Sequence, residues 1–247
     1  MKKILFTFLL VGLTLNAITL NIAVATNVSY AIQELQSKFK QIHPDIKINI
    51  ILGSSGKLTA QISHGAPYGL FMSANMLYPQ KLYEQKLATT KPRVYAKGTL
   101  ALFSTRERDF SLGIKLLQEN AIHKIALANP KTAPYGQAAF EALQTSKMYT
   151  EIQTKLIFAE SISQTLSYVV TAADIGFVAS SSLYTAKMSL YKKGKHWEEV
   201  DPSLYQPIEQ GVVLLSFAKD TKAYRLFYEF LLSPEAQKIF KKYGYII

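Results

Sequence analysis

The sequence predicts an α/β protein of two similar lobes joined by two extended crossover segments. Short apolar runs rich in β-branched residues alternate along the chain with segments of helical periodicity, and no internal repeat is evident. Four of the apolar runs end in a loop of small or polar residues that leads into a helix. In open α/β sheets such loops lie at the carboxyl ends of the strands, where ligands bind. We therefore expect the four loops to face one another across a cleft.

The elements can be placed from the same pattern. Helices are expected where apolar residues recur three or four apart, at 32–42, 58–62, 77–87, 110–117, 137–143, 162–170 and in one or two closing segments within 224–240. Strands are expected at 18–25, 46–52, 70–72, 95–104, 124–128, 156–159, 174–180 and 211–217. The segment 95–104 leads out of the first lobe, and 211–217 returns the chain to it.

Composition narrows the classes of function. The chain has 247 residues, of which 49% are hydrophobic, enough for one large domain or two ordinary ones. It has no cysteine, which excludes disulfides and thiolate metal sites. The formal net charge of +11 favours the capture of anions. Nucleic acid is not the expected partner, because the lysines are spread along the chain without a long basic run.

The N-terminus has the pattern of a secretory signal peptide. Met1-Lys2-Lys3 precedes the apolar segment 4–13, which is shorter than the roughly 20 residues of a membrane-spanning helix. Cleavage is expected after Ala17, which places the mature protein outside the cytoplasm, or tethered to the membrane if the signal is retained. The predicted organisation is a signal peptide at 1–17, a discontinuous first lobe at 18–98 and 207–247, and a second lobe at 99–206.

The stretch Gly53–Ala74 contains the clearest candidate site. Gly53-Ser54-Ser55-Gly56 follows a strand and opens a helix, whose first N–H groups have no intrahelical acceptor and bear a partial positive charge. With two serine hydroxyls beside them, this end of the helix is a suitable seat for an oxyanion. The plainer interpretation makes the serines N-caps of the helix.

Two sharper interpretations also fit part of this string. Ser54-x-x-Lys57 matches the S-x-x-K motif of serine acyl-enzymes, although the companion motifs S-D-N and K-T-G are absent. Gly56-Lys57 resembles part of a phosphate-binding P-loop, but the glycine spacing is wrong and Leu58 stands where Ser or Thr would ligate magnesium.

The other three loops are candidate donor sites for the same reason. Each follows a strand and begins a helix, where backbone N–H groups lack acceptors. Thr26, Asn27 and Ser29 are candidate donors or helix caps in the first loop, and unpaired backbone N–H groups are expected near Tyr135 and Gly136 in the second. In the third loop, Ile162 marks the start of a helix. From its side chain alone, Ile162 would be assigned to the core.

Six segments, in register along nearly the whole mature chain, resemble the periplasmic molybdate-binding proteins that supply ABC importers. They are AVATNVSYAI (Ala23–Ile32), GSSGKLTAQISHGAP (Gly53–Pro67), NPKTAPYGQAA (Asn129–Ala139), AESISQTL (Ala159–Leu166), ADIGFVA (Ala173–Ala179) and SPEAQKIFKKYGY (Ser233–Tyr245).

The resemblance implies a type II periplasmic-binding-protein fold, with two α/β lobes of mixed, mainly parallel sheets around a cleft. It implies a monomeric, non-enzymatic periplasmic protein without a cofactor. Its ligand would be molybdate or tungstate, held by neutral hydrogen-bond donors and delivered to the membrane subunits of an ABC importer. Sulfate or another tetrahedral oxyanion is the alternative ligand, and a serine acyl-enzyme using Ser54 and Lys57 is the remote one.

Carried over by position, the resemblance implies that the anion is bound by Thr26, Asn27, Ser55, Tyr135 and Ile162. Ser54, Gly136 and Ser29 are supporting candidates. Ser54 is expected to act mainly as a helix cap. Lys57 is expected to be an exposed lysine near the cleft mouth that assists capture through the long-range field.

Overall fold

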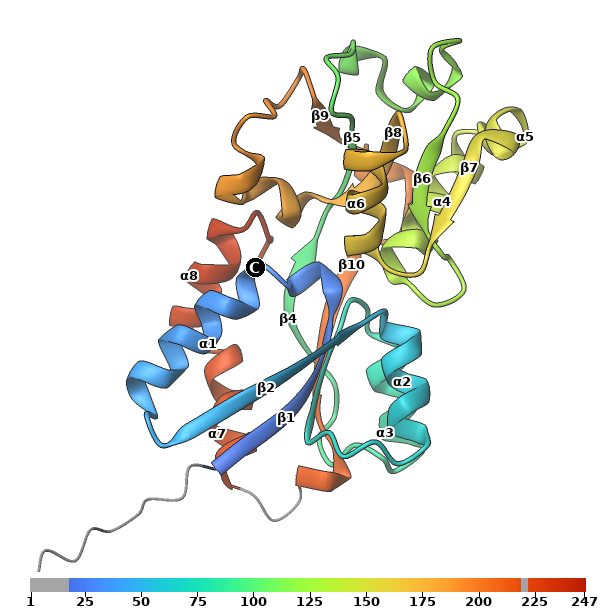
Figure 1. Ribbon diagram of the computed structural model, residues 1–247. Helices are drawn as coiled ribbons and strands as arrows, with labels where there is room; N and C mark the ends of the chain where they lie inside the picture. Colours follow the sequence, from blue (N-terminus) through green and yellow to red (C-terminus); the bar gives the residue numbers. More distant parts are fainter. Residues whose placement is uncertain (1–17, 219–221) are drawn as a thin grey trace, which may run out of the picture.

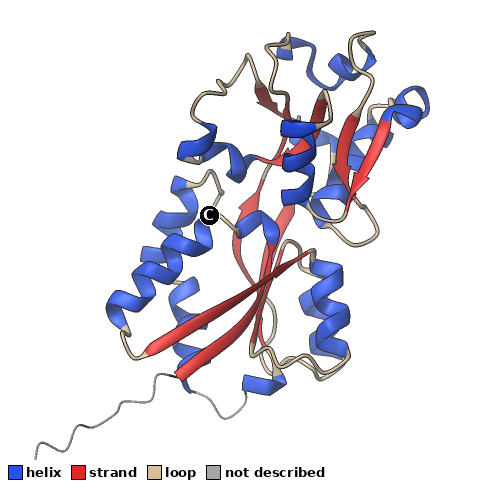
Figure 2. Ribbon diagram, viewed as in Figure 1, coloured by secondary structure: helices blue, strands red, loops and turns tan. Residues whose placement is uncertain are grey.

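The computed structural model describes residues 18–218 and 222–247, so the expected signal peptide lies outside the described residues. Two α/β lobes are stacked end to end (Figure 1), and strands β4 and β10 run up from the first lobe toward the second. Figure 2 shows a sheet with helices on its two sides in each lobe. None of the helices within the described ranges is long and apolar enough to cross a membrane.

The first sheet has the strand order β2-β1-β3-β10-β4. Its strands are β1 (Ile18–Ala25), β2 (Ile46–Gly53), β3 (Leu70–Ser73), β4 (Arg93–Gly98) and β10 (Ile208–Leu214). β1 pairs in parallel with β2 and β3, whereas β10 runs antiparallel to β3 and β4.

Helices cover both faces of this sheet because the side chains of its strands alternate between two cores. Leu20, Ile22 and Val24 of β1 pack on the side of α1, α7 and α8, while Ala23 faces α2 and α3. The helices are α1 (Ala31–Ile42), α2 (Ser55–Ser63), α3 (Leu77–Glu84), α7 (Lys222–Leu231) and α8 (Pro234–Lys242).

The second sheet has the order β7-β6-β8-β5-β9. Its strands are β5 (Leu100–Phe103), β6 (Ile125–Ala128), β7 (Leu156–Ala159), β8 (Ile175–Ala179) and β9 (Trp197–Glu199). β6 pairs in parallel with β7 and β8, and β5 runs antiparallel to β8 and β9. Its helices are α4 (Pro134–Thr145), α5 (Tyr149–Ile152) and α6 (Ile162–Thr171).

The predicted fold class of two mixed α/β sheets is confirmed. The sheets are not mainly parallel as expected, because β10 and β5 each add two antiparallel pairings and so make parallel and antiparallel pairings equal in number in each sheet. The lobe boundaries expected at 98/99 and 206/207 stay predictions. Several expected elements differ in extent, three of which matter for the paths between the sheets. The segment 95–104 is two strands, because the chain passes from one sheet to the other after Gly98. The helix expected to reach Leu87 ends at Glu84, and Lys86 adopts a left-handed backbone with φ of 59°. The returning strand begins at Ile208, three residues earlier than expected.

Candidate functional site

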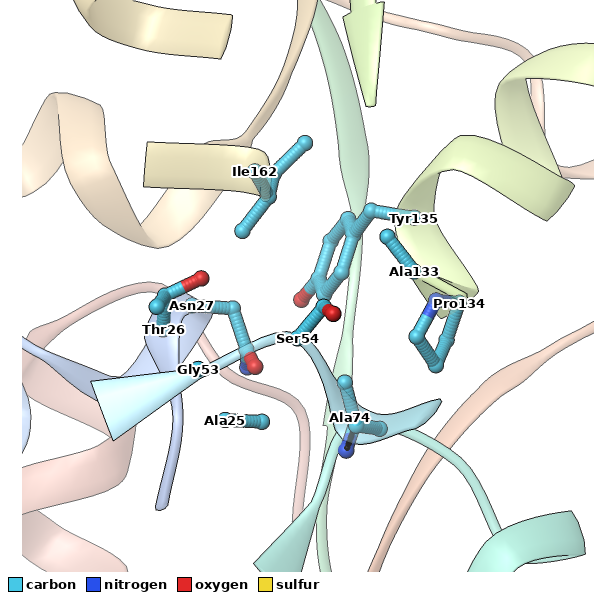
Figure 3. A pocket seen from close by; sticks show the side chains of 11 residues that line it. Ala25, Thr26, Asn27, Gly53, Ser54, Ala74, Ala133, Pro134, Tyr135 and Ile162 are labelled. Atoms are coloured by element: carbon cyan, nitrogen blue, oxygen red, sulfur yellow. Dashed lines mark hydrogen bonds between the residues drawn. The ribbon is translucent and has the colours of Figure 1, made fainter. Parts of the chain in front are cut away.

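A small cavity lies where the carboxyl ends of strands from both lobes meet. Its lining comes from the ends of β1, β2 and β3 in the first lobe and from the first turns of α4 and α6 in the second. The cavity is small: the volume in which the centre of a water molecule can lie is about 10 Å³, roughly enough for one water molecule. Figure 3 shows Thr26, Asn27 and Ser54 below the pocket and Ile162 and Tyr135 above it.

Two serines at the start of helix α2, Ser54 and Ser55, line this cavity, and their hydroxyl groups differ in hydrogen bonding. Ser55 is fully buried, and its Oγ accepts a hydrogen bond of 2.9 Å from the backbone N–H of Ala74. That bond uses a lone pair and leaves the hydroxyl proton of Ser55 available to a ligand. Ser54 is also buried, yet its Oγ has no hydrogen-bond partner. A buried hydroxyl without a partner is costly unless a ligand or water satisfies it.

The expected role of Ser54 as a side-chain cap is wrong. Ser54 does occupy the N-cap position of α2 with extended backbone angles, but its side chain makes no capping hydrogen bond. Ser54 lines the cavity instead. Both serines are therefore candidates to donate a hydrogen bond to the ligand.

The second lobe presents two helix starts to the same cavity. Tyr135 follows Pro134 at the start of α4, and Ile162 is the first residue of α6. Their backbone N–H groups stand in first helical turns, where no intrahelical acceptor exists. The cap of α6 is made by Ser161, whose Oγ accepts from the N–H of Gln164 at 3.3 Å.

Asn27 is held by a buried polar network behind the cavity. Its Nδ2 donates to Gln210 Oε1 at 2.8 Å and to the Tyr245 hydroxyl at 3.1 Å. Its Oδ1 is buried without a partner. An amide oxygen only accepts hydrogen bonds, so with this orientation the donor that Asn27 can offer to an anion is its backbone N–H.

The tyrosines around this network stay neutral. Burial raises the pKa of Tyr135 well above its usual value, and the neighbouring Tyr245 and Tyr95 raise it further. Burial also raises the pKa of Tyr245 to about 12. At neutral pH these phenols are protonated and add no negative charge beside an anion.

The two lobes touch one another around the cavity. The N–H of Gly56 in α2 donates to the carbonyl of Thr132 at 2.9 Å. On the other side, the Ser163 hydroxyl donates to the carbonyl of Thr26 at 3.0 Å. The described structure is therefore a closed arrangement of the lobes.

Lys57 is an exposed lysine at the cleft, as expected, but it also makes a contact that the sequence does not predict. Its ammonium group pairs with the Glu160 carboxylate of the second lobe at 2.5 Å. The two side chains are 53% and 61% exposed, so the pair lies at the rim of the cleft. The partner is 103 residues away in sequence, which is why the local pattern could not reveal it.

The structure brings the sequence-predicted candidates together. Thr26, Asn27, Ser55, Tyr135 and Ile162 all line the one cavity, as does the supporting candidate Ser54. Gly136 and Ser29, the other supporting candidates, are not among the lining residues.

Sequence reasoning missed several of the lining residues, which are Ala25, Gly53, Ala74, Ala133 and Pro134. Ala74 follows β3 directly, so the rule that ligands bind at carboxyl ends of strands could have found it. None of the cavity-lining residues in the described ranges is charged.

Comparisons with known proteins agree with this architecture. The profile of a family described as "Bacterial extracellular solute-binding protein" matches residues 20–246. The molybdate-binding protein ModA of Azotobacter vinelandii is 33% identical over 231 residues, which are 93% of this chain and 90% of that protein. ModA of Rhodobacter capsulatus is 34% identical over 226 residues, covering 91% of this chain and 86% of that protein. A solved structure of the Azotobacter vinelandii periplasmic molybdate-binding protein matches with a TM-score of 0.84 at 31% identity, covering 92% of this chain and 99% of that one.

Proposed function

Because the chain belongs to the family of bacterial extracellular solute-binding proteins, we propose that it captures molybdate or tungstate in the cavity between its lobes. It then delivers the anion to the membrane subunits of an ABC importer. Both ModA relatives are named for molybdate binding, and together they support this ligand over sulfate.

The observation that carries the proposal is a cavity with a neutral lining and donor groups from both lobes. The donors proposed are the Ser55 hydroxyl and the backbone N–H groups of Thr26, Asn27, Tyr135 and Ile162, with the Ser54 hydroxyl in support. Fixed dipoles in a water-poor cavity stabilise an anion without reorganising. Lysine or arginine in their place would attract many anions by charge alone, whereas a small closed cavity discriminates by size.

Asn27 Oδ1 modifies the expectation of a site made only of donors. This oxygen is a buried acceptor without a partner. A bare anion gains nothing from it, whereas a protonated anion could donate to it. We therefore attribute the rejection of both sulfate and phosphate to their smaller size. Phosphate is the more informative competitor, because it is partly protonated at neutral pH and could donate a hydrogen bond to Asn27 Oδ1.

The same geometry supports a binding protein over an acyl-enzyme. A serine nucleophile needs a base within hydrogen-bond reach. Ser54 Oγ has no hydrogen-bond partner, and the Lys57 ammonium is paired with Glu160. The proposed protein is a monomer without a cofactor, exported by its N-terminal segment to the periplasm.

Calorimetric titration of the purified mature protein with molybdate, tungstate, sulfate and phosphate tests the proposal. We expect one site per chain, similar affinities for molybdate and tungstate, and far weaker binding of the other two anions. Equal affinity for sulfate and molybdate would overturn the molybdate assignment in favour of a general oxyanion binder. A burst of product from an activated ester would revive the acyl-enzyme.

A further inference from the structure

A buried glutamine lies at the junction of the two lobes, behind the candidate site. Gln210 is fully buried in β10, the strand that brings the chain back from the second lobe to the first. The pairing of β10 with β4 shifts register between Gln210 and Gly211. Such an irregularity re-aims side chains locally.

The Gln210 carboxamide contacts one candidate ligand residue from each lobe. Its Oε1 accepts from Asn27 Nδ2 of the first lobe at 2.8 Å. Its Nε2 donates to the Tyr135 hydroxyl of the second lobe at 3.3 Å and to the Ile208 carbonyl at 3.3 Å. Tyr95 from the neighbouring strand donates to Oε1 at 3.4 Å.

The other crossover strand, β4, packs against the contact between Gln210 and Tyr135. Gly98 ends β4 just before the chain enters the second lobe. A Cβ at this position would lie 1.9 Å from the Tyr135 hydroxyl oxygen and 2.7 Å from Gln210 Nε2. The Tyr135 hydroxyl and the Gln210 carboxamide therefore fill the space that a side chain at position 98 would need.

We propose that Gln210 is a positioning residue for the oxyanion site, linking Asn27 and Tyr135 through the junction of the lobes when they close. The inference rests on the proposed function. Gln210 does not line the cavity, so it acts through the two residues it holds. Since Tyr135 moves with the second lobe, opening separates it from Asn27, and the Gln210 bridge favours the closed arrangement.

The first test is Gln210→Leu, which replaces the carboxamide with an apolar group of similar size and removes both bridging hydrogen bonds. We expect the Kd for molybdate to rise about 30-fold, the effect of losing two neutral hydrogen bonds. Most of the change should appear in the dissociation rate, because the bridge is complete only in the closed state. Glu209→Gln is the matched control, since the neighbouring Glu209 makes a surface ion pair with Lys97 at 3.1 Å. Its affinity should stay within about twofold of wild type.

A second variant distinguishes positioning from a general loss of stability. Gln210→Glu retains an acceptor for Asn27 but places an ionisable group in a buried position, where burial raises the pKa of a carboxyl group. Ionisation with rising pH would add a negative charge behind the anion. We therefore expect the affinity of this variant for molybdate to fall between pH 6 and 9, while that of wild type stays flat.

The third test is a double-mutant cycle of Gln210→Leu with Tyr135→Phe, which removes the hydroxyl that Gln210 contacts. If Gln210 acts in part through this hydroxyl, the double variant loses less affinity than the sum of the single losses. Additive losses, or a Gln210→Leu protein that binds and releases molybdate like wild type, would overturn the inference.

The two proposals can fail separately. Small-angle X-ray scattering of wild type and Gln210→Leu, with and without 1 mM molybdate, reports lobe closure directly. A wild type that neither binds nor closes contradicts the proposed function. A wild type and a Gln210→Leu variant that close to the same extent at the same molybdate concentration contradict only the role of Gln210.

Discussion

The ion pair between Lys57 and Glu160 gives a prediction about the kinetics of binding. Lys57 belongs to the first turn of α2, and Glu160 precedes α6 in the other lobe, so their 2.5 Å contact exists only when the cleft is closed. Removing Lys57 should therefore speed the release of molybdate more than it slows capture. This differs from the sequence expectation, in which the lysine affects only association.

The expected change in the dissociation rate follows from the solvent exposure of the two side chains. Both side chains are more than half exposed, at 53% and 61%. Ion pairs of this kind contribute about 0.2–1 kcal/mol, or about 1.4- to 5-fold in affinity. Salt screens them over about 8 Å at physiological ionic strength. Lys57→Ala should raise the dissociation rate by that factor at low salt, and the effect should shrink as salt is added.

Stopped-flow measurement of association and dissociation at two salt concentrations checks this. Lys131→Ala is a suitable control, because Lys131 is exposed near the cleft and makes no ion pair within the described residues. The exchanged pair Lys57→Glu with Glu160→Lys should restore slow dissociation. A large loss of affinity that salt does not change would show that Lys57 contacts the anion, and the neutral site would be refuted.

Four further predictions concern the site and its support. Ser55→Ala should weaken molybdate binding about 10- to 150-fold without unfolding the protein, through the loss of a hydrogen bond to a charged group. Ser54→Ala, measured in the same titration, should also weaken binding, and wild-type affinity would exclude its hydroxyl from the site. Gly136→Ala should lower both stability and affinity, because its Cβ would lie 2.2 Å from the Ala128 carbonyl oxygen and displace the start of α4; an unchanged melting temperature and Kd would contradict this. Unfolding in urea should require less denaturant above about pH 10, because the unfolded state ionises tyrosine there while Tyr245 in the folded state does so only at about 12. The Tyr245→Phe variant should lose less stability over the same pH range, and an equal loss would argue against a raised pKa.

Local patterns were sufficient to predict the fold, because hydrophobic periodicity and helix starts are properties of neighbouring residues. The strand ends before Thr26, Ser54 and Tyr135 could be found in this way, and the rule for open α/β sheets placed them at one cleft. The role of Ile162 could not be found from its side chain, because a backbone N–H donates regardless of residue type. That assignment came only from the resemblance.

Side-chain contacts between residues far apart in the chain could not be predicted from the sequence. Lys57 and Glu160 are 103 residues apart, and Asn27 and Gln210 are 183 apart. Neither pair has a local signal, since an exposed lysine and a glutamine in a strand are ordinary features. Similarly, Ser54 sits where a cap is expected, and only the three-dimensional contacts reveal that its hydroxyl makes no capping bond.

The central claim is that neutral donors from both lobes hold a bare oxyanion. The most direct test is a crystal structure of the mature protein with molybdate, the metal being located by its anomalous scattering. We predict one molybdate in the cavity, with its oxygens about 2.7–3.2 Å from the Ser55 hydroxyl and from the backbone nitrogens of Tyr135 and Ile162. No lysine or arginine should lie within hydrogen-bond distance of it. A molybdate bound directly to Lys57, or seated outside this cavity, would contradict the account.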